Sequence, residues 1–192
     1  IDPGCWDALE RHELEQFITN NGLRPVKLVL THAHIDHVLG NAWAHSRYGL
    51  LPEVHAADLP LLEGAERVAS MYGISYEPSP MPERFLEPGT PVELNGHKLE
   101  VLFVPGHSPG HVALFSKEQG FVIAGDVLFH NSIGRTDLPG GNTDTLLQSI
   151  REVLFPLGDE VTVYSGHGPE TTIGRERLEN PFLNGRGTPQ WS

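Results

Sequence analysis

The sequence predicts an α/β fold in which two sheets pack together with helices outside, a four-layer αββα sandwich. Segments with helical and strand periodicity alternate along the chain, and two pairs of strands are joined by hairpin turns. No linker of the kind that separates domains interrupts this pattern. With 192 residues, of which 39% are hydrophobic, the chain can bury a substantial core. We therefore expect a single domain over residues 1–192.

The first half of the chain is predicted to be mainly helical. Residues 7–21 carry apolar side chains at a helical period that Gly22 ends. Residues 26–30 form an aliphatic strand, and a second short strand lies near Val54. Helices are also expected over residues 41–48 and 58–71, the latter with Asp58 as N-cap. Residues 77–91 contain five prolines, which predicts a surface loop.

The second half of the chain is predicted to be richer in strands. Residues 92–94 and 98–104 form a hairpin around Asn95-Gly96, a dipeptide typical of two-residue turns. Residues 111–115 and 121–124 form another hairpin, which turns at residues 118–120. A helix over residues 143–154, capped by Asn142 or Thr143, precedes the last strand at residues 161–164.

The most informative stretch, Thr31-His32-Ala33-His34-Ile35-Asp36-His37, directly follows the first predicted strand. In an extended segment, side chains two residues apart project the same way, so His32 and His34 can share one cation. Asp36 and His37, at the turn into the next helix, can face a second. Imidazole and carboxylate ligands together suit zinc, iron or manganese, and argue against an all-oxygen calcium site.

Three later segments repeat one pattern, in which an apolar strand runs into a turn with glycine and a ligand-type residue follows. These residues are His107 in Pro-Gly-His, Asp126 in Ala-Gly-Asp and His167 in Ser-Gly-His. Strand ends are where loops converge into a site in layered α/β folds. One such motif is weak evidence, but the repetition predicts that all three residues belong to the same site.

In order and identity, these seven residues resemble the metal ligands of the metallo-β-lactamase-fold hydrolases. The resemblance implies that His32, His34 and His107 hold the first metal. It implies that Asp36, His37 and His167 hold the second, and that Asp126 bridges the two. Residues 129–142, 166–174 and 179–182 are similar to stretches of the small glyoxalase II-like (hydroxyacylglutathione hydrolase-like) members. Members usually carry one or two strands before the turn at Ile1-Asp2-Pro3-Gly4, so we expect the first strand or strands of the fold to be lacking here.

The resemblance implies a hydrolase that cleaves a thioester such as S-lactoylglutathione. Two divalent ions, with zinc expected first and iron or manganese as alternatives, would lower the pKa of a shared water and supply hydroxide. Asp36 and Asp126 are then catalytic as ligands rather than as acid–base groups. A thiolate leaves readily, so a thioester needs no general acid. The alternative is a persulfide dioxygenase that uses a mononuclear iron.

Arg135 is a predicted substrate-binding residue, because its guanidinium is suited to a substrate carboxylate or carbonyl. It lies in Gly134-Arg135-Thr136-Asp137, which resembles both the small hydrolases and the dioxygenases. Pairing of Arg135 with Asp137, which would only shape the loop, is the alternative. Larger glyoxalase II enzymes carry aromatic residues after the basic one, and Thr136 and Asp137 stand in their place here.

Composition excludes several classes of protein. The formal net charge of −12 opposes binding to nucleic acid or to an anionic membrane surface. No apolar run approaches the roughly 20 residues of a membrane span. Cys5 is the only cysteine, which fits a reducing compartment and predicts a cytoplasmic location. A β-lactamase is disfavoured, because several such enzymes carry Cys where Asp126 stands. A small-molecule thioester is the expected partner.

The remaining histidines are not predicted to be ligands. His111 begins a strand and is interpreted as a hydrogen-bonding residue beside the site. The sequence leaves His55 and His130 open as residues near the pocket. The others lie in helix or turn contexts and are expected on the surface: His12, His45 and His97.

Overall fold

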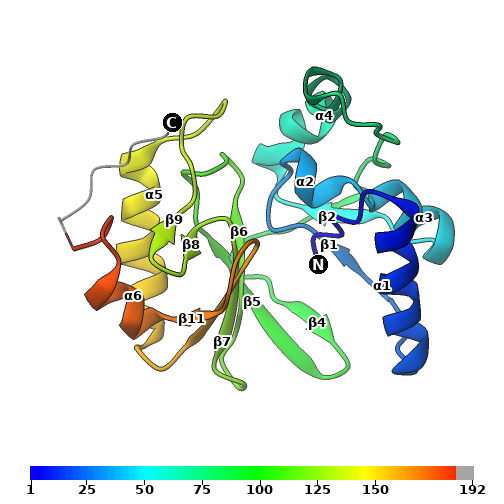
Figure 1. Ribbon diagram of the computed structural model, residues 1–192. Coiled ribbons are helices and arrows are strands. Elements are labelled where there is room, and N and C mark those ends of the chain that lie inside the picture. The colour runs from blue at the N-terminus through cyan, green and yellow to red at the C-terminus, as the bar shows by residue number, and fades with distance from the viewer. Residues whose placement is uncertain (185–192) are drawn as a thin grey trace. The chain divides into compact units, whose positions relative to one another are not determined.

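The computed structural model describes residues 1–184 and divides the chain into two compact units, residues 1–86 and the residues from Glu87 onward (Figure 1). Both units combine helices with a sheet, so the predicted α/β class is confirmed. The single domain over residues 1–192 stays a prediction, and its residues 185–192 lie outside the described part. Within residues 1–184, no helix combines the length and the apolar character that crossing a membrane requires.

The first unit contains a three-stranded parallel sheet. Its strands are β1 (Leu28–Val29), β2 (Pro52–Val54) and β3 (Arg84–Phe85), in that order. The predicted strand over residues 26–30 is therefore shorter than expected. The prediction of an uninterrupted loop over residues 77–91 was wrong, because β3 pairs with β2 and the Leu86 N–H donates to the Val54 carbonyl at 3.0 Å. An edge strand needs partners on one side only, which lets it form between prolines.

The helices of the first unit are α1 (Ala8–Asn20), α2 (Ile35–Val38), α3 (Asn41–Tyr48) and α4 (Leu59–Tyr72). The Asp7 carboxylate caps α1 by accepting the Glu10 N–H. Asp58 is the N-cap residue of α4, as predicted, but its side chain makes no capping hydrogen bond. It ends a short 3₁₀ turn (Ala56–Asp58), and its buried carboxylate accepts the Ala33 N–H at 2.9 Å. A core forms from Leu30, Ala33, Val38, Val54, Leu62 and Ala65.

The second unit contains a six-stranded sheet in the order β11-β10-β7-β6-β5-β4. The strands are β4 (Val92–Leu94), β5 (His97–Phe103), β6 (Val112–Ser116), β7 (Phe121–Gly125), β10 (Thr162–Ser165) and β11 (Thr171–Thr172). Both predicted hairpins are confirmed. Asn95 and Gly96 adopt positive φ angles of 50° and 84°, as a tight turn between antiparallel strands requires.

Four short elements of the second unit were not predicted: β8 (Leu128–Phe129), β9 (Ser132–Ile133), β11 (Thr171–Thr172) and α6 (Ile173–Glu179). The first two pair only with each other, so neither carries the alternating pattern of a longer strand. Helix α6 begins where the Thr172 side chain accepts the Arg175 N–H, a cap that precedes only seven helical residues.

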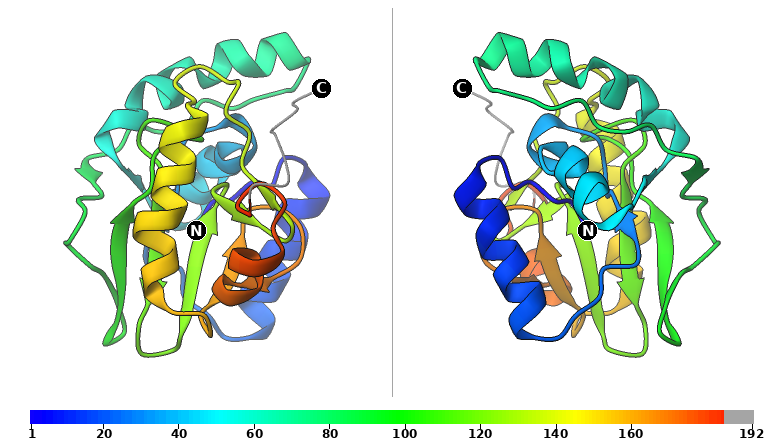
Figure 2. Two further views of the ribbon diagram at one scale, coloured as in Figure 1. Left: turned by 90° about the vertical axis from the view of Figure 1, so that its left-hand side faces the viewer. Right: turned by 90° about the vertical axis from the view of Figure 1, so that its right-hand side faces the viewer.

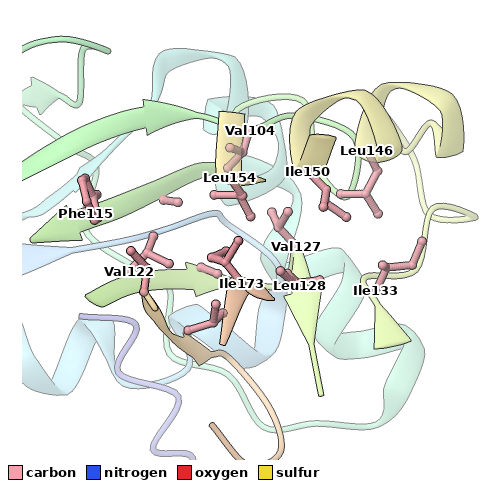
Figure 3. Packing of buried hydrophobic residues seen from close by; sticks show 14 of the residues in the cluster. Val104, Phe115, Val122, Val127, Leu128, Ile133, Leu146, Ile150, Leu154 and Ile173 are labelled. Carbon is pink, nitrogen blue, oxygen red and sulfur yellow. The ribbon is translucent and has the colours of Figure 1, made fainter. Parts of the chain in front are cut away.

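A second core lies where α5 (Thr143–Ser149) and its continuation over Ile150–Leu154 pack on the six-stranded sheet. Helices α5 and α6 lie on the same face of this sheet (Figure 2). Leu146, Ile150 and Leu154 meet Val104, Val122 and Ile173 in the interior (Figure 3). Of the two predicted caps of α5, Asn142 is confirmed, because its side chain accepts the Thr145 N–H at 2.9 Å.

Candidate metal centre

The N-terminal ligand set, His32, His34, Asp36 and His37, lies on the loop after β1 and on the first turn of α2. The ring centroids of His32 and His34 are 4.8 Å apart, and those of His32 and His37 are 4.0 Å apart. His32 and His37 are buried, whereas Asp36 is exposed. Ligand atoms of His32 and His34 lie within 4.8 Å of each other, as do those of Asp36 and His37. The pairing predicted from the sequence, of His32 with His34 and of Asp36 with His37, is therefore present in this unit.

Asp2 orients two members of the N-terminal ligand set. Its carboxylate accepts hydrogen bonds from the Thr31 N–H and hydroxyl, both at 2.7 Å. The same carboxylate lies 3.2 Å from His37 Nδ1. Because the Thr31 hydroxyl donates to Asp2, its oxygen is left to accept from His32 Nδ1, 3.1 Å away. Both imidazoles then carry their proton on Nδ1, which leaves Nε2 of each as the atom that could bind a metal ion.

Sequence reasoning interpreted Asp2 only as part of a turn and missed this role. A usable signal was present, because Asp2 is a carboxylate at a predicted strand end followed by a Pro-Gly turn. Asp126 was selected because an apolar strand and a glycine precede it, whereas at Asp2 the glycine follows and only Ile1 precedes.

The C-terminal ligand set, His107, Asp126 and His167, lies beyond the ends of β5, β7 and β10. Strands β7 and β10 are parallel neighbours, so Asp126 and His167 emerge at the same edge of the sheet. One carboxylate oxygen of Asp126 is 3.6 Å from His107 Nε2 and 3.6 Å from His167 Nε2. This exceeds a hydrogen-bond distance. It is close to the roughly 3.4 Å between two ligands on a tetrahedral ion with bonds of about 2.1 Å.

Two hydrogen bonds fix the orientation of this set. His107 Nδ1 lies 2.7 Å from the Arg135 carbonyl oxygen, so it donates its proton there and leaves Nε2 as the acceptor. The backbone N–H of Asp126 donates to His111 Nε2 at 3.0 Å. His111 is completely buried, and the prediction that it is a hydrogen-bonding residue is confirmed.

The loop that begins at Gly134 and contacts His107 through the Arg135 carbonyl passes close to the Asp126 backbone. Only glycine fits at position 134. A Cβ atom at Gly134 would overlap the Asp126 carbonyl oxygen and lie 3.1 Å from His107 Nδ1. The Gly134 N–H donates to the Val127 carbonyl at 3.2 Å, which holds the loop in this place. The Gly-Arg-Thr-Asp stretch therefore contacts both ligands through its backbone.

Arg135 pairs with Asp137 through two hydrogen bonds, from Nε to Oδ1 at 2.7 Å and from Nη2 to Oδ2 at 2.6 Å. This pair lowers the pKa of Asp137 to about 2, chiefly through the hydrogen bond from the guanidinium. The loop-shaping alternative to substrate binding is thus present in the structure. Both side chains remain partly exposed, at 49% and 40%. Substrate binding by Arg135 stays a prediction.

The three histidines expected on the surface are exposed. His12 and His45 make local contacts on the surface, with Gln16 and with the Leu50 carbonyl. His97 lies 3.5 Å from Glu118 and is exposed. His55 Nδ1 accepts the Ala57 N–H at the start of a 3₁₀ turn.

Both ligand sets fit transition-metal ions by the chemistry of their donors. Each combines imidazole nitrogens with a carboxylate, the donor types that bind zinc, iron and manganese. In each set, at least one histidine has its Nδ1 beside an oxygen of the chain, as for His37 and His107. Ligating histidines in metalloproteins are typically oriented in this way.

A family model described as the metallo-beta-lactamase superfamily matches residues 1–167, a range that includes all seven residues. The chain belongs to the metallo-β-lactamase superfamily. Among its relatives in this superfamily, the probable metallo-hydrolase YqgX of Bacillus subtilis is 41% identical, over 96% of this chain and 86% of the relative. The hydroxyacylglutathione hydrolase GloC of Haemophilus influenzae is 38% identical, over 97% of this chain and 87% of the relative.

Solved structures agree with membership of this superfamily. The crystal structure of TTHA1623 in a di-iron-bound form has a TM-score of 0.85 and 43% identity, and covers 95% of this chain and 87% of that chain. The B3 metallo-β-lactamase BLEG-1 has a TM-score of 0.84 and 33% identity, over 90% and 84% of the two chains. The predicted metallo-β-lactamase fold is confirmed.

Proposed function

We propose that this protein is a dinuclear-metal hydrolase that cleaves a thioester such as S-lactoylglutathione. The observation that carries the proposal is the 38% identity to a hydroxyacylglutathione hydrolase over 97% of the chain. It is supported by seven residues of the correct types, of which His37, His107 and Asp126 are held by hydrogen bonds or close contacts with neighbouring groups. We infer that the two ligand sets act together as one centre.

In this proposal, His32, His34 and His107 hold one ion, and Asp36, His37 and His167 hold the other. Asp126 would bridge the pair, because a carboxylate has two oxygens and this one lies with Oδ2 at 3.6 Å from His107 Nε2 and from His167 Nε2. Zinc is the ion that we expect. Iron is a direct alternative, since a 43% identical structure holds two iron ions, and manganese is a third.

Two bound ions would lower the pKa of a shared water and polarise the carbonyl of the substrate. The chain itself supplies orientation. Asp2 and the Arg135 carbonyl hold the Nδ1–H groups of the ligands, so that each Nε2 faces the centre. Near neutral pH the departing thiolate needs little protonation, because the pKa of a thiol is only about 8.5. No side chain is therefore required as a general acid.

The substrate is expected to be a small molecule rather than a nucleic acid or a membrane. The formal net charge of −12 disfavours polyanionic partners, although two bound cations would offset part of it. A cytoplasmic location is proposed on the single cysteine, since a chain without disulfides suits a reducing compartment.

Three assays on the same protein of measured metal content test the proposal. Apoprotein is reconstituted with zinc, iron or manganese and given S-lactoylglutathione, the β-lactam nitrocefin, or glutathione persulfide in an oxygen electrode. We expect hydrolysis of the thioester with kcat/KM above about 10⁴ M⁻¹ s⁻¹, within the usual range for enzymes. Faster nitrocefin hydrolysis would instead identify a β-lactamase, like the 33% identical BLEG-1. Oxygen consumption by protein with a single iron would identify a persulfide dioxygenase.

A further inference from the structure

Asp126 lies just past the end of the β7 ladder, where its backbone N–H needs a partner from elsewhere in the chain. The last residue of β7 is Gly125, which is in register with Ser165 of β10, and the β6 ladder ends earlier on this strand, at Ile123. A backbone donor in this buried place is costly to leave without an acceptor. The acceptor is His111 Nε2, 3.0 Å away.

His111 also closes the loop that carries His107. Its carbonyl oxygen accepts the Val104 N–H at 2.9 Å, directly after β5 and β6 stop pairing at Phe103 and Val112. Residues 104–111 are thereby held as a closed loop between two strands. The His111 ring is completely buried and stands 5.9 Å from the His107 ring, at 72° to it.

We propose that His111 is a positioning residue that sets the spacing between His107 and Asp126. Its main chain holds the loop of one ligand, and its side chain holds the backbone of the other. The inference rests on the proposed function, in which both of these residues bind metal. It goes further by naming the residue that keeps His107 Nε2 and Asp126 Oδ2 3.6 Å apart, a distance close to that between two ligands of one ion.

The hydrogen bond also defines which side chains can replace His111. Because Nε2 accepts, the ring is neutral and carries its proton on Nδ1. A Gln side chain places an amide oxygen at about the same reach as Nε2. A Met side chain has nearly the shape of Gln, but its thioether is only a weak acceptor. His111→Gln and His111→Met therefore differ mainly in whether the new side chain can accept the hydrogen bond from the Asp126 N–H.

The test compares metal affinity in the two variants, measured by competition with a chromophoric chelator and without any substrate. We expect His111→Gln to bind zinc within about threefold of the wild type. His111→Met should bind at least one ion about 10–100-fold more weakly, as is typical when a residue that orients a metal ligand is lost. The exposed His97, changed to Met, controls for the substitution itself.

Amide hydrogen exchange at Asp126 in the apoproteins is the second readout. Exchange should be faster in His111→Met than in the wild type and in His111→Gln, while the Tm values of the two apo variants remain alike. If His111→Met does not fold, His111→Asn replaces it, because its side chain is too short to reach the amide and the same losses are expected.

Wild-type affinity in His111→Met, or equal losses of affinity in the Gln and Met variants, would overturn the positioning role. Wild-type protein that binds no metal would overturn the proposed function instead. In that case, amide exchange at Asp126 still shows whether His111 holds this backbone.

Discussion

At the scale of single residues, the structure shows candidate ligands whose side chains are oriented by neighbouring groups. His37 is held through Nδ1 by Asp2, and His107 through Nδ1 by the Arg135 carbonyl. A ligand fixed in this way loses little rotamer freedom when a metal binds. The carboxylate of Asp126 stands between two histidines of its own set, at 3.6 Å from each. We therefore expect its removal to affect binding and catalysis together.

Replacing Asp126 with Ala should remove one of two bound ions and most of the activity. Without the bridging carboxylate, two cations would repel each other at short range with less negative charge between them. We expect kcat/KM for the thioester to fall by on the order of 10³-fold, about 4 kcal/mol of transition-state stabilisation. Elemental analysis and steady-state kinetics measure both effects. Asp144→Ala, at an exposed carboxylate on α5, is the control, and near-normal turnover of Asp126→Ala would place the bridge elsewhere.

Replacing Arg135 with Ala separates its two possible roles. If the guanidinium binds substrate, KM should rise much more for an anionic thioester than for a neutral one, with unchanged metal content. Asp137→Asn should then lower KM for the anionic thioester, because it weakens the competing pair. With the pKa of Asp137 at about 2, this carboxylate stays ionised throughout the assay range. Equal KM changes for both thioesters would favour the loop-shaping role.

At the scale of secondary-structure elements, one buried carboxylate joins three short segments that sequence patterns did not reveal. Glu176 on α6 is completely buried. It accepts the Thr171 hydroxyl at 2.6 Å, the Asn131 N–H at 2.9 Å and the Asn180 side-chain amide at 2.8 Å. These contacts tie α6 to β11 and to the turn between β8 and β9. That hairpin directly follows Asp126 and leads into the loop that supports His107.

Replacing Glu176 with Gln should destabilise this part of the chain. Gln has the shape of Glu, but its NH₂ group would face the N–H and O–H donors that Glu176 now accepts from. Hydrogen bonds to a charged group contribute about 1.5–3 kcal/mol each. We expect the free energy of unfolding to fall by about that amount in urea titrations of the apoprotein. Glu179→Gln on the same helix, which removes only an exposed pair with Arg175, should change it by less than about 0.5 kcal/mol. Equal stability of the two variants would contradict a role for the network.

At the scale of the whole molecule, the proposed centre takes ligands from both compact units. The N-terminal ligand set belongs to residues 1–86, and the C-terminal set to the residues from Glu87 onward. The superfamily model also runs through both units, over residues 1–167. Metal binding should therefore be coupled to the stability of the entire chain.

The folded protein should bind two transition-metal ions per chain. Because each ion would take ligands from both units, metal should slow amide hydrogen exchange in β2 of the first unit and in β7 of the second together. Elemental analysis gives the stoichiometry, and exchange with and without zinc gives the coupling. One ion or fewer after reconstitution with excess zinc, iron or manganese would contradict the dinuclear centre. Protection confined to one unit would show that the two ligand sets do not act together.

Several features of this protein could be predicted from the sequence because their signals are local. Asn95-Gly96 specifies a tight turn within two residues, and helix α1 follows from an apolar spacing that Gly22 ends. The His-x-His-x-Asp-His loop shows its chemistry within six positions. Order along the chain then extended that motif to His107, Asp126 and His167, and superfamily membership is confirmed.

The sequence singled out His111 as a hydrogen-bonding residue, but only the tertiary structure decided which group each supporting residue contacts. Asp2 reaches Thr31, and the Arg135 carbonyl reaches His107, across 29 and 28 positions of sequence. His111 accepts the backbone N–H of Asp126. Every residue except proline has this N–H, so the residue type at position 126 does not reveal the contact. Periodicity and turn chemistry act within a few neighbours, whereas these hydrogen bonds exist because packing of the strands brings distant segments to hydrogen-bonding distance. The sequence alone therefore determined the candidate ligands, and the fold determined the groups that orient them.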